Sequence, residues 1–198
     1  MKNLTFLILS FAISYTTLAQ NNLSAKVLAD LSIDARTRVL AFFDCIEQLG
    51  LNELDAGLKQ ELINQITLSF TLNGTVEERS KYRSYGVTRK IREYLNLVRY
   101  RGERKLVIIN YEIIDNLSAN ELVPHKNSDG TVSYKGYIIV RQFYCRMKEG
   151  DKLLDTLDNC AYQDVTDKKV YVEIRQLDSN LGRSWVALIE RIVVLSVK

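Results

Sequence analysis

The spacing of the hydrophobic residues changes at Gly102, and this change restricts the fold more than any other feature of the sequence. Before Gly102, apolar residues recur every three or four positions. After it, they alternate with polar residues. The first spacing places residues on one face of a helix, and the second places them on one face of a strand. The sequence therefore predicts helices in the first half of the chain and strands in the second.

Three helices are expected before Gly102. The first covers residues 33–49, with Ser32 as its N-cap and Gly50 as its stop. The second begins after Asn52, and the third begins at Thr88. The apolar faces of the first and third helices consist of Ala35, Val39, Phe42, Phe43, Ile46 and Leu49, and of Ile91, Tyr94, Leu95 and Val98. A short strand, 66–72, is expected to end at the Asn73-Gly74 turn signal.

The second half predicts long strands over residues 105–114, 134–147, 169–177 and 185–197, and no proline interrupts any of them. Helices followed by a run of strands indicate the α+β class, with N-terminal helices packed on one face of an antiparallel sheet. Long antiparallel strands tend to curl. A curved sheet closed by helices forms a cone-like pocket.

The N-terminus has the three-part layout of a secretory signal peptide. A basic start is followed by an apolar run over residues 4–18 and by small residues at Thr17 and Ala19. The run is shorter than the roughly 20 residues that cross a bilayer, so no transmembrane anchor is expected. We predict a signal peptide over 1–19, a lead-in segment over 20–31 and a single domain over 32–198. The protein is then exported, and is periplasmic or secreted.

The net charge of +3 includes Lys2 and is too small to indicate nucleic-acid binding. Residues 79–105 nevertheless contain ten basic residues and two acidic ones. This excess has two interpretations. It is a solvated helix face, or it is a patch that binds an anionic polymer or lipid headgroup. The residues of such a patch would be Arg83, Arg89, Lys90 and Arg92.

Three cysteines leave one unpaired. Cys145 and Cys160 flank a polar connection, and in an oxidising compartment they are candidates for a disulfide across two strands. Cys45 lies on the apolar helix pattern, so we expect a buried thiol. No metal site is predicted, because the cysteines are far apart and the single histidine, His125, has no ligand partner at a usable spacing.

The sequence resembles the nuclear-transport-factor-2-like family, whose fold is a cone of bent antiparallel strands capped by N-terminal helices. The resemblance is carried by Thr88-Arg89-Lys90-Ile91-Arg92-Glu93-Tyr94-Leu95, by the stretch from Tyr162 to Val172 and by the closing strand 185–197. It implies a cone with a pocket from about Ile33 onward. The family includes both enzymes and non-catalytic pocket domains, so the fold does not choose between them.

Two basic residues fall on otherwise apolar strand faces. Arg141 shares a parity with Ile139 and Phe143, and Arg191 shares a face with Trp185 and its apolar neighbours. Arg141, Trp185 and Arg191 are therefore the candidates for a ligand pocket. The alternative is a strand bend or bulge, such as one near Glu190 that turns Arg191 outward.

These patterns favour an exported, non-enzymatic domain that binds a small ligand or an envelope protein. No catalytic residue and no cofactor are indicated, because the chain lacks a phosphate-binding glycine loop and a histidine placed beside a nucleophile. Two alternatives stay open: an enzyme that uses a carboxylate in the cone, and a surface protein that binds through residues 79–105. A homodimer also stays open.

Overall fold

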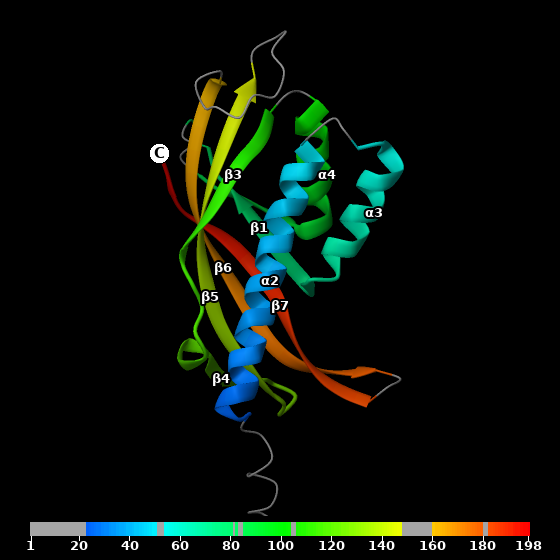
Figure 1. The fold of residues 1–198 in the computed structure, drawn as a ribbon, viewed down its shortest axis with the longest axis vertical. Coiled ribbons are helices and arrows are strands. Elements are labelled where there is room, and N and C mark those ends of the chain that lie inside the picture. Colours follow the sequence, from blue (N-terminus) through cyan, green and yellow to red (C-terminus); the bar gives the residue numbers. More distant parts are fainter. Residues whose placement is uncertain are drawn as a thin grey trace, which may run out of the picture.

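The computed structural model describes residues 23–50, 54–80, 82, 85–103, 106–147, 160–179 and 182–198. In this part of the chain, three α-helices lie on one side of a curved, unclosed seven-stranded sheet, where α2 and α4 pack on the strands and α3 packs on α2 and α4 (Figure 1). The predicted α+β class is confirmed. The predicted signal peptide, residues 1–19, lies outside the described residues. None of the described helices is long and apolar enough to cross a membrane.

The helices are α2 (Ala25–Gly50), α3 (Ala56–Thr67) and α4 (Ile91–Glu103). α2 continues the predicted helix 33–49 back through the lead-in segment, whose sequence is compatible with a helix from Ser24, because Leu28 and Leu31 extend its apolar stripe onto the core. Ser32 is therefore not a cap: it lies inside the helix and its hydroxyl donates to the Ala29 carbonyl at 2.7 Å. α3 is capped by Asp55, whose carboxylate accepts from the Leu58 amide at 2.9 Å.

The strands are β1 (Phe70–Glu78), β2 (Val87–Lys90), β3 (Leu106–Asp115), β4 (Val123–Lys126), β5 (Val132–Met147), β6 (Cys160–Ser179) and β7 (Gly182–Val197), and a 3₁₀ turn, η1 (Ala119–Glu121), precedes β4. Their order is β2-β1-β7-β6-β5-β3, with β4 also paired to β5. β1 runs parallel to β7, whereas the other pairs are antiparallel. The sheet is therefore mixed, and the wholly antiparallel sheet that we predicted is wrong. The spacing of apolar residues predicts which face of a strand is buried, but it does not predict whether the neighbouring strand runs parallel or antiparallel.

The Asn73-Gly74 pair lies within β1 instead of ending a strand. A Cβ atom at Gly74 would meet the Phe70 ring at 2.8 Å, so only glycine fits here. The pairing of β1 with β7 also shifts between Phe70 and Thr75. This glycine therefore serves a close approach and a bulge, two known uses of glycine in strands.

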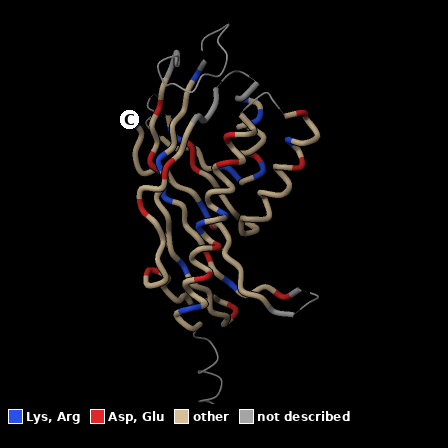
Figure 2. The backbone as a smooth tube through the Cα atoms, in the orientation of Figure 1, with Lys and Arg blue, Asp and Glu red and all other residues tan. Residues whose placement is uncertain are grey.

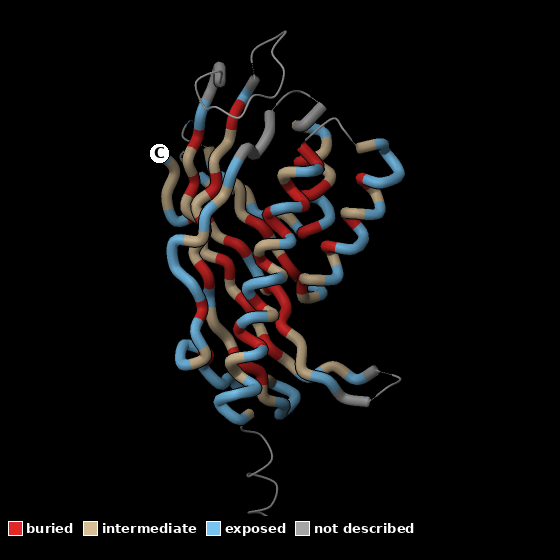
Figure 3. The backbone as a smooth tube through the Cα atoms, viewed as in Figure 1, coloured by how far each residue is buried: buried red, intermediate tan, exposed pale blue. Residues whose placement is uncertain are grey.

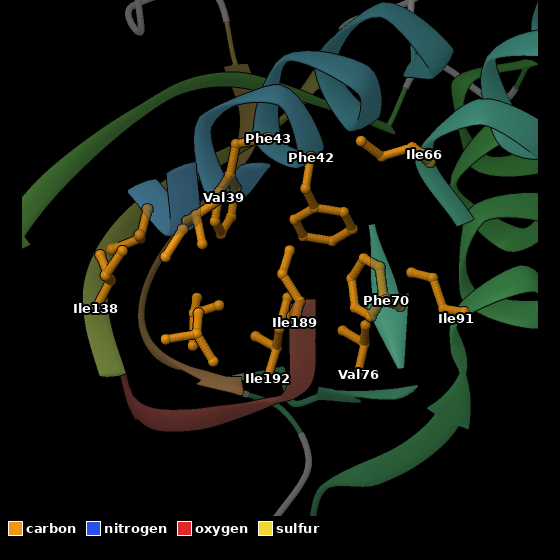
Figure 4. Packing of buried hydrophobic residues seen from close by; sticks show 14 of the residues in the cluster. Val39, Phe42, Phe43, Ile66, Phe70, Val76, Ile91, Ile138, Ile189 and Ile192 are labelled. Atoms are coloured by element: carbon orange, nitrogen blue, oxygen red, sulfur yellow. The ribbon is translucent and has the colours of Figure 1, made fainter. Parts of the chain in front are cut away.

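The hydrophobic core lies between the helices and the sheet, and the buried stretches of the strands face the helices (Figure 3). Phe42 of α2 is at its centre, with ring centroids 5.1 Å from Phe43 and 5.3 Å from Phe70. Figure 4 shows these rings packed over Ile189 and Ile192 of β7. The predicted apolar stripe of α4 is confirmed, since its four members are buried. We call the face of the sheet that the helices cover its inner face, and the opposite face its outer face.

Candidate functional site

A pocket of about 390 Å³ opens where the end of β1, β2 and α4 meet β5 and β6. Its floor is formed by Tyr144 of β5 and by Asp164, Thr166 and Lys168 of β6. Its volume lies within the range of roughly 300–1,000 Å³ that small-molecule sites occupy. The pocket is therefore large enough to hold an organic ligand.

The floor of the pocket continues the core-facing side of β6. Alternate residues of a strand share a face, and the buried residues Val170 and Val172 define the inner one. Lys168, Thr166 and Asp164 follow on the same face and are 1%, 1% and 5% exposed. The inner face of β6 therefore changes from apolar to polar at Lys168, although it stays buried.

The Lys168 ammonium uses only some of its hydrogen-bond donors within the described part of the chain. Its Nζ donates to the Tyr144 hydroxyl at 3.2 Å and lies 5.6 Å from the ring centroids of both Tyr94 and Tyr144. Among the described residues, no carboxylate forms an ion pair with it. An ammonium has three donors, and a buried charge is costly when it is not paired. This lysine therefore has capacity for a further partner on the pocket side.

Two neighbours of Lys168 also lack partners. Within the part of the chain that the structure describes, neither the Thr166 hydroxyl nor the two polar atoms of the Gln142 side chain make a hydrogen bond. Gln142 lies directly opposite Thr166 in the β5–β6 pairing and is wholly buried. Buried polar groups in native proteins are nearly always satisfied by protein, water or ligand. Of these two residues, Thr166 lines the pocket, so its hydroxyl is free to bond to water or to a ligand there.

Tyr94 of α4 is buried behind the pocket lining, next to Lys168. Burial is the main reason why its pKa lies well above the usual value for a tyrosine, and the nearby Tyr144 and Glu78 raise it further. Tyr94 is consequently a neutral hydroxyl at physiological pH. It places an aromatic ring beside Lys168 and adds no charge.

One wall of the pocket is an ion-pair cluster around Glu78. The Glu78 carboxylate accepts from Arg89 Nε at 2.9 Å and from Arg101, and Arg89 also donates to Glu93 at 2.6 Å. The hydrogen bonds that Arg89 donates to Glu78 and then to Glu93 raise the pKa of Arg89. Two arginines of the basic stretch are therefore engaged inside the molecule and do not form a free cationic surface.

The predicted basic patch does not come together as one surface. Arg89 turns toward Glu78, and Arg92 reaches α3, where it donates to Asn64 at 3.1 Å. Lys90 is exposed, and Arg83 lies outside the described residues. Figure 2 shows basic and acidic residues interspersed along the described chain. Binding of an anionic polymer through these four residues stays a prediction without structural support.

Arg141 lies on the outer face of the sheet, away from the pocket. Its guanidinium binds both oxygens of Asp167, at 2.7 and 3.2 Å, and donates to Glu112 at 3.3 Å. The hydrogen bonds from Arg141 are the main reason why the pKa of Asp167 is lowered. This arginine is engaged in an outer-face ion-pair cluster.

Arg191 is exposed on the outer face, so the inward orientation that parity favoured is wrong and the alternative, a bulge near Glu190, is the one observed. The register between β6 and β7 shifts between Tyr171 and Val172, which places a bulge at Glu190 and reverses the parity that follows it. The Arg191 guanidinium stacks on Tyr171, 4.3 Å from the ring centroid. Trp185 is half-buried against Tyr134 and lines a separate cleft. The three predicted pocket residues are thus not brought together.

Cys45 is buried and free, and burial raises the pKa of its thiol to about 12. Cys145 is disulfide-bonded and lies on β5, next to the strand that Cys160 begins. The side chain of Cys160 lies outside the described residues, so the pairing of these two cysteines stays a prediction. Among the described side chains, no three His, Cys, Asp or Glu residues are placed to hold a metal ion.

Sequence reasoning missed the four residues that matter most here: Glu78, Gln142, Thr166 and Lys168. The run Asp167-Lys168-Lys169 has the composition of a solvated face. A usable signal existed, however, because extending the parity of Val170 and Val172 backward places Lys168 and Thr166 on the buried face.

Comparisons of this chain with protein-family models, with curated proteins and with solved structures gave no match.

Proposed function

We propose that this protein is an exported domain that binds a small ligand in the pocket between α4, β1 and β6. The observation that carries the proposal is the buried polar floor of this pocket, where, among the described residues, the Thr166 hydroxyl has no hydrogen-bond partner and Lys168 forms no ion pair. A folded protein rarely leaves such groups unsatisfied, and a ligand in the adjoining pocket would satisfy them.

Two further features support this proposal. The sequence of residues 1–19 has the pattern of a signal peptide, which favours export to the periplasm or beyond. Helices packed on a curved sheet, with a pocket at the inner face, agree with a cone of the nuclear-transport-factor-2-like kind. We therefore place the protein in that structural class as part of the proposal.

The test is to fill the pocket and follow ligand binding. Val87 lines the pocket and is half-buried, so Val87→Trp should occupy part of its volume. Leu195→Trp is a matched control, since Leu195 is 49% exposed on β7 outside the pocket lining. Native mass spectrometry of protein purified from its own host should detect a bound compound in the wild type and in Leu195→Trp, and lose it in Val87→Trp. Equal retention by Val87→Trp would contradict the proposed site.

An enzyme is the second candidate, and Asp164 is the observation that favours it. This carboxylate is 5% exposed and lines the same pocket, where it would suit acid–base work on a bound ligand. Incubating the captured compound with the protein and following its mass separates the two candidates. Conversion that Asp164→Asn abolishes while binding persists would establish an enzyme. An unchanged compound would support a binding domain.

A further inference from the structure

We infer that the ligand is an organic anion whose oxyanion group sits against Lys168 and Thr166 and whose uncharged body extends past Val87 toward the mouth of the pocket. The inference rests on the proposed function, because it names the ligand class of the same pocket. It follows from the charge of Lys168, from the donors gathered there and from the rest of the lining.

Lys168 brings a positive charge to the pocket, and no carboxylate among the described residues forms an ion pair with it. Its side chain is 1% exposed, and the hydrogen bond that it makes within the described part of the chain is to the Tyr144 hydroxyl. Asp164 lies four residues away on the same strand, which separates the two Cα atoms by about 13 Å. The carboxylate of Glu78 is engaged by Arg89 and Arg101. An oxyanion beside Lys168 would supply the missing countercharge.

Several hydrogen-bond donors lie together at this point. The Thr166 hydroxyl is two residues from Lys168 on the same face of β6, and the Gln142 amide lies opposite Thr166 on β5. The Thr166 hydroxyl and the remaining protons of the ammonium line the pocket and can donate to a ligand, whereas Gln142 does not line it. An oxyanion accepts several hydrogen bonds at once, and bonds to ionised groups are the strong ones. A neutral ligand would leave the ammonium without a charged partner.

The remaining lining agrees with an anion that has an uncharged body. Four basic residues and two acidic residues line the pocket, so its field favours negative ligands. Val87 and the Tyr144 ring add apolar surface to the lining. A carboxylate, phosphate or sulfonate group joined to a ring or a short chain matches this arrangement.

Two fluorescent probes that differ in charge test the inference. 8-Anilinonaphthalene-1-sulfonate is an anion, and N-phenyl-1-naphthylamine has the same ring system without the sulfonate. The wild type should bind the sulfonate at least about tenfold more tightly, because a hydrogen bond to an ionised group is worth that much. Lys168→Met should remove this preference and leave the affinity for the neutral probe unchanged. Lys169→Met is the matched control, since Lys169 is the next residue and lies on the outer face over Tyr137.

The outcomes separate the ligand class from the pocket itself. If both probes bind the wild type equally, and Val87→Trp blocks both, the pocket is supported as a binding site and the inference of an anionic ligand is overturned. If Val87→Trp blocks neither, the binding is elsewhere and the proposed function fails as well. The wild-type comparison decides the question even if Lys168→Met does not fold, and Thr166→Val offers a milder second variant. Displacement of the sulfonate by 1-naphthoate, 1-naphthyl phosphate and neutral 1-naphthalenemethanol then distinguishes carboxylate from phosphate ligands.

Discussion

Replacing Lys168 by methionine should stabilise the ligand-free protein. Methionine has a similar length and fits an irregular apolar site. The substitution removes an ammonium that is 1% exposed and lacks a carboxylate partner among the described residues. Replacing buried charges by hydrophobic residues of similar volume is often stabilising, even where the charges are paired. The effect should be larger where the charge has no ionic partner.

The magnitude follows from the contacts of Lys168. Burial of the charge costs several kcal/mol. The hydrogen bond to Tyr144 offsets about 1.5–3 kcal/mol of this cost. The rings of Tyr94 and Tyr144 lie 5.6 Å from Nζ, close to the limit of cation–π attraction, so each adds about 0.5 kcal/mol. We expect a net gain of about 1–3 kcal/mol for Lys168→Met. A gain of about 2 kcal/mol corresponds to a rise of roughly 4–8 °C in Tm.

Urea and thermal unfolding of the ligand-free protein measure this gain, with Lys169→Met as the neighbouring control. Lys169 Nζ lies 3.6 Å from the Tyr137 ring centroid on the outer face, so its loss should cost about 0.5–1 kcal/mol. Adjacent lysines on one strand should therefore shift stability in opposite directions. A Lys168→Met protein that is less stable than the wild type would show that the ammonium is compensated within the protein. In that case Lys168 would not need an anionic ligand as its counterion.

Phe42→Ala should lower the free energy of unfolding by about 3–5 kcal/mol in urea, because the ring is fully buried among aromatic neighbours. Glu78→Gln should cost about 1–3 kcal/mol by the same assay, since it removes the shared partner of two partly exposed arginines. Asp167 has a lowered pKa when folded, so its ionised form stabilises the protein above its unfolded pKa of about 3.9, and this contribution is lost as the pH falls below that value. Thermal melts from pH 7 to pH 2 should accordingly show Asp167→Asn less stable at pH 7 and the difference from wild type shrinking in acid. Cys45, with its pKa near 12, should resist iodoacetamide at pH 8 in the native state and react after unfolding.

The parts of the fold that sequence reasoning predicted are those with an apolar signal. The stripe of α4 and the buried face of α2 follow from the spacing of residues such as Tyr94 and Phe42, because burial of apolar side chains is what the spacing records. β6 is longer than the predicted strand 169–177, because the few apolar residues of its first half, such as Ala161, Tyr162 and Val165, do not alternate regularly with polar ones. Hydrophobic periodicity carries no information where that alternation is lacking.

The candidate site was largely invisible for the same reason. Lys168 faces inward, although lysine is usually a surface residue. In the sequence, only its parity with the apolar residues Val170 and Val172 indicates that it lies on the buried face. For Arg191 the reverse holds: its residue type suggests the surface, where it lies, whereas its parity with Trp185 and Ile189 favours the inner face. A bulge at Glu190 reverses the faces of β7, and no glycine or proline marks that position in the sequence. A one-residue insertion is a property of the pairing with β6 and cannot be read from one strand alone.

The parallel pairing of β1 with β7 also determines when the molecule can fold. Phe70 meets Ile189 and Val76 meets Ile192, so strands about 120 residues apart in the chain must join to complete the core. Closing so long a loop is slow, and a nascent chain that lacks β7 has nothing to cover the inner edge of β1. The earlier elements therefore stay without their hydrophobic partner until the last strand has been synthesised.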